Sequence, residues 1–137
     1  MTDPDLVSNK IARIEVAVQE LRTIARPDLL RDDILQQRFV ERTLQIAIQA
    51  AMDVASHVVA DEYLGEPRTA REIFALLGRR DVIDRSLAAR LELMVGFRNI
   101  VVHGYQSVDT RIMQDIVEHR LHDLLAFTSA ITSRLQA

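Results

Sequence analysis

Residues 46–60, IAIQAAMDVASHVVA, are apolar on almost every face of the helix that they predict. The polar residues that interrupt this stretch and the turn before it are few: Gln45, Gln49, Asp53, Ser56 and His57. A helix that is apolar nearly all round lies at the centre of a bundle or in a subunit interface. Other amphipathic helices must therefore cover it.

The N-terminal sequence supplies the first covering helix. Asp3 can cap it, Pro4 suits its first turn, and apolar residues recur at spacings of three and four from Val7 to Ala25. Arg26-Pro27 breaks this helix. Asp28 can start a short or continuous helical segment that leads into residues 34 and 35. The long helical element then continues to about residue 63, with Gly65 and Pro67 closing it.

Three further helices are predicted in the C-terminal half. Residues 69–72, TARE, form a capping box that opens a short helix, and Gly78 can end it. A fourth helix starts near Asp84 and ends around residues 103–104. Asp109 caps a fifth helix, whose apolar residues extend to Ile131.

Composition restricts the class of protein. The 137 residues fit one domain, residues 1–137, and 48% apolar residues with only 4 glycines and 3 prolines favour an all-α fold. The absence of cysteine excludes disulfides and thiolate sites, and it permits a reducing compartment. No apolar run approaches a bilayer span of about 20 residues, and the acidic N-terminus is unlike a signal peptide. We therefore expect a soluble, cytoplasmic protein without a membrane partner.

The formal net charge of −3 argues against a broadly basic nucleic-acid binder. Any contact with RNA should be confined to a local patch.

One eight-residue stretch, residues 98–105 with the sequence RNIVVHGY, concentrates side chains suited to phosphodiester chemistry. Arg98 can hold a phosphate, Asn99 can orient a ring or a phosphate through its amide, and His103 can transfer a proton near neutral pH. On a continuous helix Arg98 and His103 point roughly 140° apart. The two side chains can approach the same point only if the helix ends near His103, if a second subunit faces the first, or if both hold.

Each motif residue also has a purely structural interpretation. A lone histidine is favourable at a helix C-terminus, and a lone arginine is usually half of an ion pair, here with Glu92 or Asp109. Tyr105 alone would lay its ring over an edge of the core.

Other polar residues are weaker candidates. Asp53 and His57 lie four apart, so the carboxylate could orient the histidine in support of the site, although a satisfied buried polar pair is the simpler interpretation. His119 and His122 have metal-compatible spacing but no recognisable third ligand, so a solvated helix face is expected. Arg38, Glu41 and Arg42 could line a cleft, but surface charge is the default.

The spacing of Arg98, Asn99, His103 and Tyr105 resembles the signature of the HEPN superfamily, and it most closely resembles the HepT toxins. The similarity extends to residues 42–57 and 109–127, so most of the chain is covered. It implies an HEPN-type bundle of four to five helices that forms a homodimer, with two copies of the motif meeting in a cleft.

The resemblance also implies an activity. HepT proteins are toxins of HepT–MntA toxin–antitoxin systems (type II/VII-like). The implied enzyme is a metal-independent endoribonuclease without a cofactor, which cleaves RNA by attack of the 2′-OH and does not cut DNA. Arg98 and His103 would be catalytic and Asn99 supporting. Tyr105 would be AMPylated by the partner, a minimal nucleotidyltransferase antitoxin.

Two other functions remain open from the sequence. The first is a non-catalytic helical module that binds a nucleotide or RNA for a nucleotidyltransferase. The second is a structural dimerisation domain, which would have no affinity for RNA.

Overall fold

The computed structural model describes residues 3–103 and 109–136, and in these ranges the chain is helical with no strand. The predicted all-α class is confirmed. The elements, in chain order, are α1 (Pro4–Thr23), η1 (Pro27–Leu29), α2 (Ile34–Asp61), α3 (Glu72–Arg79), α4 (Arg85–His103), α5 (Thr110–Asp115), η2 (Ile116–Arg120) and α6 (Leu121–Gln136).

Helix α1 begins where the sequence predicts. The helical segment expected near Asp28 is the short turn η1, which is not continuous with α2, and α2 begins at Ile34. The Asp3 carboxylate accepts hydrogen bonds from the N–H groups of the first turn of α1, and Asp33 does the same for α2. Between the two helices the chain turns through η1, a single 3₁₀ turn that starts at Pro27. These caps and this break fix α1 against α2 as the most extensively packed helix pair of the molecule.

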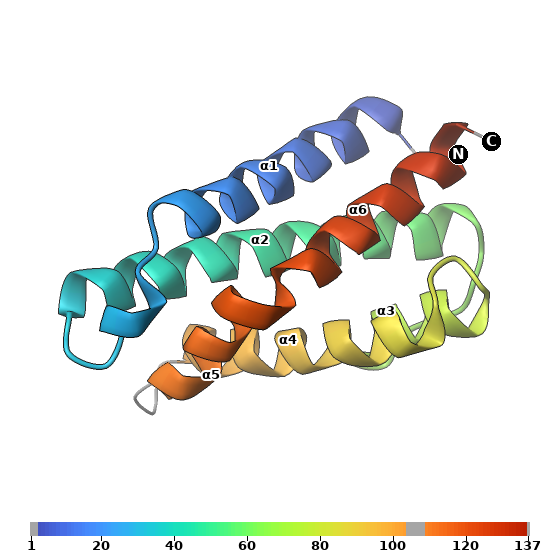
Figure 1. Cartoon of the computed structure of the whole chain (residues 1–137). Helices are drawn as coiled ribbons and strands as arrows, with labels where there is room; N and C mark the ends of the chain where they lie inside the picture. The colour runs from blue at the N-terminus through green and yellow to red at the C-terminus, as the bar shows by residue number, and fades with distance from the viewer. Residues whose placement is uncertain (1–2, 104–108, 137) are drawn as a thin grey trace.

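Helix α2 is the central element, as its apolar stretch predicts. It packs against α1, α3, α4 and α6, and α6 crosses in front of it between α1 and α4 (Figure 1). The start of α1 and the end of α6 lie at the same end of the bundle. Twelve residues of α2 are buried, among them Val54, Ala55 and Val58. The polar residues of α2 are therefore left to a narrow strip between its neighbours.

The prediction that Gly78 ends the third helix is wrong. Helix α3 continues to Arg79, and Asp81 instead takes the left-handed conformation that follows the helix, with φ +58°. A Cβ built on Gly78 would lie 2.9 Å from the Cβ of Ala88. Gly78 therefore serves the close approach of α3 to α4.

The predicted fifth helix is present but is interrupted. Asp109 caps α5, as expected, and the π-helical turn η2 joins α5 to α6. The buried apolar positions on either side of this turn, Ile116 and Leu121, are five residues apart. One π turn brings residues at this spacing to the same face.

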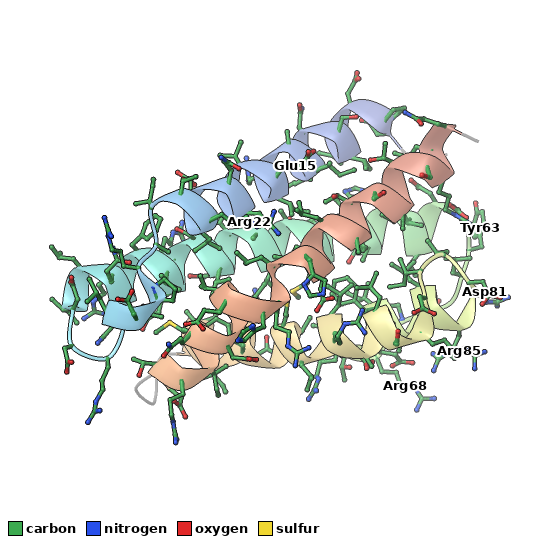
Figure 2. All side chains as sticks on the ribbon, viewed as in Figure 1. Glu15, Arg22, Tyr63, Arg68, Asp81 and Arg85 are labelled. Carbon is green, nitrogen blue, oxygen red and sulfur yellow. The ribbon has the colours of Figure 1, made fainter. Side chains whose placement is uncertain are left out.

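Charged side chains of both signs surround the bundle, and the residues labelled in Figure 2 are all exposed. None of the described helices has the length and apolar character that crossing a bilayer requires.

Candidate active site

Arg98 projects from α4 toward α2 and is held by two amide oxygens. Its Nη2 donates to Oε1 of Gln49 at 2.5 Å, and its Nη1 donates to Oδ1 of Asn99 at 3.0 Å. Its Nε is buried and has no hydrogen-bond partner among the described residues. The guanidinium is thus fixed in place by neutral acceptors.

The ion pairs considered for Arg98 from the sequence do not form between described residues. Asp109 is instead paired with Arg111, whose Nη2 lies 3.2 Å from a carboxylate oxygen of Asp109. Hydrogen bonding to the Arg111 side chain lowers the pKa of Asp109 below its ordinary value, and the Arg111 N–H lowers it further. Asp109 therefore caps α5, and its described ion pair is with Arg111 and not with Arg98.

Gln49 is the contact that sequence reasoning missed. It is the polar residue of α2 that contacts Arg98, but the two are far apart in sequence, so no local motif links them. A signal was present, because Gln45, Gln49 and Asp53 recur every four residues on an otherwise apolar helix. This spacing places them on one face.

Gln49 also contacts Asp53, which forms an ion pair with Lys10. Its Nε2 donates to Oδ1 of Asp53 at 2.9 Å, and Nζ of Lys10 lies 3.1 Å from Oδ2 of the same carboxylate. A polar chain thus runs from Lys10 on α1, through Asp53 and Gln49 on α2, to Arg98 on α4. All four side chains are half-buried.

The expected pair of Asp53 and His57 does not form as a hydrogen bond between described residues. Both residues line a shallow hollow together with Lys10, but Asp53 directs its oxygens to Gln49 and Lys10. Asn99 contacts the guanidinium of Arg98, one of the groups that could anchor a phosphate. An orienting contact from Asn99 to the His103 ring falls outside the described side chains.

His103 is the last residue of α4 that the structure describes, so the predicted end of the fourth helix near residues 103–104 lies at the edge of the described part. Its side chain, and the whole of Tyr105, lie outside the described part of the structure. The assigned roles of both residues therefore remain predictions.

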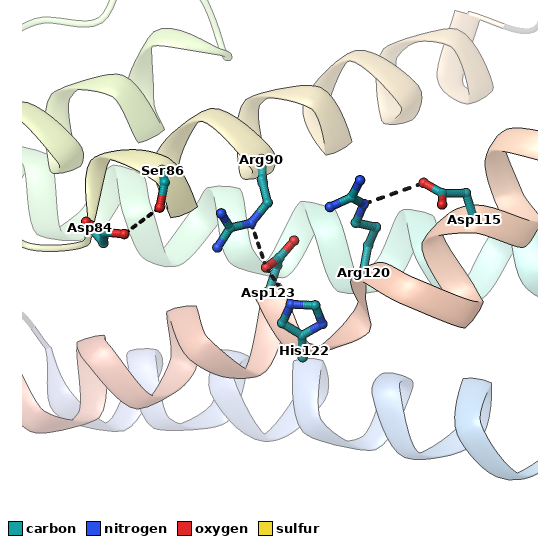
Figure 3. A network of polar contacts seen from close by, with 7 residues as sticks. All are labelled: Asp84, Ser86, Arg90, Asp115, Arg120, His122 and Asp123. Carbon is teal, nitrogen blue, oxygen red and sulfur yellow. Dashed lines mark hydrogen bonds and ion pairs between the residues drawn. The ribbon is translucent and has the colours of Figure 1, made fainter.

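The two histidines near the C-terminus, His119 and His122, lie close to neighbouring acids. Nε2 of His122 lies 3.2 Å from Oδ1 of Asp123, and His119 lies 3.7 Å from Glu118. Figure 3 shows Asp123 between His122 and Arg90, whose Nε donates to it at 2.9 Å. Asp123 is fully buried, so this pair ties α4 to α6. Among the described side chains no three potential metal ligands cluster.

A different face of α4 carries a groove of about 410 Å³. Apolar side chains from α4 and α5 line it, and Leu93, Ile100 and Ile112 are 68, 46 and 44% exposed. Ile100 belongs to the motif segment, but it lies two residues from Arg98 and therefore projects from another side of α4.

Comparison with known proteins gives consistent matches over nearly the whole chain. The model of the family described as "Ribonuclease HepT-like" matches residues 11–131. The chain is 33% identical over 128 residues to the mRNA nuclease HepT of Shewanella oneidensis, with 93% of this chain and 96% of the relative covered. It is 27% identical to the tRNA nuclease HepT of Aphanizomenon flos-aquae, covering 97% and 92% of the two chains.

Solved structures agree with these matches. The tri-AMPylated HEPN toxin of Shewanella oneidensis, in complex with its MNT antitoxin, superposes with a TM-score of 0.89 at 32% identity, covering 96% of this chain and 99% of that one. The fold, the motif on α4 and the family match all agree: the chain belongs to the HepT-like ribonuclease family.

Proposed function

We propose that this protein is a metal-independent endoribonuclease and the toxin of a toxin–antitoxin pair, acting in the cytoplasm as one domain over residues 1–137. The family match and the two relatives named as RNA nucleases support this activity. The observation that carries the proposal is the state of Arg98. It is anchored on two neutral amides, with no ion-pair partner among the described residues, five positions before His103.

The proposed reaction is transfer of the phosphoryl group from the 5′ oxygen to the neighbouring 2′ oxygen. A base takes the proton of the 2′-OH, the O2′–P bond forms, and the P–O5′ bond breaks as an acid protonates the leaving oxygen. The products are a 2′,3′-cyclic phosphate and a 5′-hydroxyl. Histidine has a reference pKa of about 6.5 in model peptides, so this residue type suits either proton transfer, and we assign these transfers to His103. Arg98 would hold the phosphate and stabilise its added negative charge.

The proposed active unit is a homodimer. Two apolar side chains of the motif segment, Ile100 and Val102, expose 46 and 44% of their surfaces on different sides of α4. A second copy that covered these side chains would bring a second His103 toward the same cleft. Two histidines could then divide the roles of base and acid.

The proposed partner is a minimal nucleotidyltransferase of the MntA type, and Tyr105 is the proposed site of AMPylation. The Shewanella toxin was solved in AMPylated form with its MNT antitoxin. Another similar structure is a toxin–antitoxin complex with AMP-PNP. AMP on Tyr105 would place bulk and negative charge two residues from His103, which would repel RNA.

The activity is tested with an RNA substrate and a chimera. We expect the purified protein to cut end-labelled RNA in excess EDTA, and to cut a DNA oligonucleotide only at a single inserted ribonucleotide. The reason is that the nucleophile belongs to the substrate and not to a metal-bound water. The products should carry a cyclic phosphate, detected by mass spectrometry. Cleavage of all-DNA, or loss of cleavage in EDTA, would contradict the mechanism.

A protein that binds the RNA tightly but never cuts it, with Tyr105 unmodified by intact mass, would instead favour the non-catalytic binding module.

The regulation is tested by Tyr105→Phe. Removing the acceptor hydroxyl should prevent AMPylation, so that the co-expressed antitoxin no longer relieves growth arrest while the unmodified variant still cleaves RNA. Intact mass after incubation with ATP and the antitoxin measures the modification, with Tyr63→Phe as the control because Tyr63 is 91% exposed and lies outside the motif. Addition of AMP to the Tyr105→Phe protein would show that the acceptor is a different residue.

A further inference from the structure

We infer that Gln49 is a positioning residue that leaves the charge of Arg98 uncompensated, by acting as a neutral spacer between its guanidinium and the carboxylate of Asp53. The inference rests on the proposed role of Arg98 as the phosphate-binding group. It adds a residue from a different helix, outside the motif on α4.

The surrounding groups determine the orientation of the Gln49 amide. Asp53 presents only acceptors to Gln49, so Nε2 must face it, and this contact measures 2.9 Å. Oε1 then faces Arg98, which presents only donors, at 2.5 Å. The opposite orientation would set donor against donor and acceptor against acceptor. The amide is therefore locked, and its oxygen fixes one edge of the guanidinium.

The charges along the polar chain are arranged so that Arg98 remains uncompensated. Lys10 and Asp53 form an ion pair at 3.1 Å, which balances the carboxylate. Gln49 carries no charge and separates that carboxylate from Arg98 by one side chain. A direct pair of arginine and carboxylate would be a strong, bidentate competitor for any phosphate. The spacer supplies the geometric support of such a pair without its negative charge.

Gln49→Glu tests this role because the charge state of the introduced side chain can be switched. When protonated, the new carboxyl group has an O–H to donate to Asp53 and a C=O to accept from Arg98, which is the hydrogen-bond pattern of the native amide. When ionised, it places a carboxylate directly on Arg98. The charged groups around it are Arg98 on α4, Lys10 on α1, and Asp53 and His57 on α2. Two adjacent carboxylates disfavour double ionisation, so the introduced carboxyl group and Asp53 would share a proton as the pH falls.

The experiment measures affinity for a 2′-O-methyl RNA oligonucleotide, which cannot be cleaved, from about pH 4 to pH 8, a range that reaches the ordinary pKa of a glutamate carboxyl group, about 4.3. At the upper end Gln49→Glu should bind about tenfold more weakly than the wild type, because a carboxylate now competes for Arg98. The ratio of variant to wild-type affinity should rise as the pH falls. Taking this ratio removes the wild type's own pH dependence.

Gln45→Glu is the matched control. It adds the same charge one turn earlier on α2, where the described contact of Gln45 is a 3.5 Å hydrogen bond with exposed Arg42. Its affinity ratio should stay near one at every pH. Gln49→Leu, which removes both hydrogen bonds and adds no charge, should show a pH-independent loss. Thermal unfolding of each variant confirms that it is folded.

Three results would overturn the inference: unchanged affinity of Gln49→Glu, a loss that is the same at every pH, or an equal loss in Gln45→Glu. The proposed ribonuclease activity is scored separately, on the same oligonucleotide with free 2′-OH groups. Binding that depends on Gln49 without any cleavage would leave this inference standing and count against the enzyme.

Discussion

Replacing His103 with alanine is expected to slow RNA cleavage by ~10²–10⁴-fold, the usual loss when a general acid or base is removed. The variant should fold normally, because α4 is anchored by buried residues earlier in the helix, such as Leu91 and Val95. Affinity for uncleavable RNA should change little. Single-turnover cleavage of end-labelled RNA measures the first effect, and thermal unfolding measures the second.

The pH profile gives this prediction a second readout. Wild-type cleavage should depend on a group that titrates near neutral pH, and the variant should lose that dependence. His119→Ala is the control, because its side chain is 66% exposed and its described partner is Glu118. Full cleavage by a folded and nuclease-free His103→Ala protein would refute the role of His103.

Replacing Arg98 with alanine is expected to cost ~10²–10³-fold in the cleavage rate, comparable with removing one group that stabilises transition-state charge. Unlike His103→Ala, it should also weaken binding of uncleavable RNA, since the guanidinium holds the phosphate in the ground state as well. Comparing these two variants for rate and for affinity separates proton transfer from phosphate binding.

Arg98→Lys is the informative companion. Lysine keeps the charge but carries its three donors on one nitrogen, so it lacks the planar fork that reaches the oxygens of Gln49 and Asn99 from two separate nitrogens. It should recover part of the affinity and little of the rate. Arg22→Ala, on the exposed side of α1, controls for loss of one positive charge (Figure 2). If Arg98→Ala cleaved as fast as the wild type, the active site would have to be sought elsewhere.

Local signals in the sequence were sufficient to predict much of the fold. Asp3 and Asp109 cap helices as predicted, and the break at Pro27 is where proline chemistry places it. The errors arose where packing overrides local preference. Glycine often follows the end of a helix, but Gly78 lies within α3. There it leaves room for the side chain of Ala88 on α4.

For the candidate site, the sequence predicted the residues that lie on the fourth helix and missed the contact from another helix. Arg98 and Asn99 are neighbours in sequence, and their contact is local. Gln49 could be recognised as a polar interruption of an apolar helix, but its partner could not, because the crossing of α2 and α4 is decided by the whole core. The same holds for Lys10, which reaches Asp53 from α1.

The π turn η2 has a consequence for how this family of chains can vary in length. Ile116 and Leu121 lie on the same face although they are five residues apart. In an α-helix, residues four apart share a face, so the π turn contains one additional residue. Loss of one residue here would return the segment to ordinary α-helical spacing and keep both apolar faces in phase. The intervening Glu118, His119 and Arg120 are exposed, whereas Val117 is half-buried against the core, so such a change would redirect three surface side chains and repack Val117. The turn is therefore a site where evolution can insert or delete a residue while the register of the core is preserved.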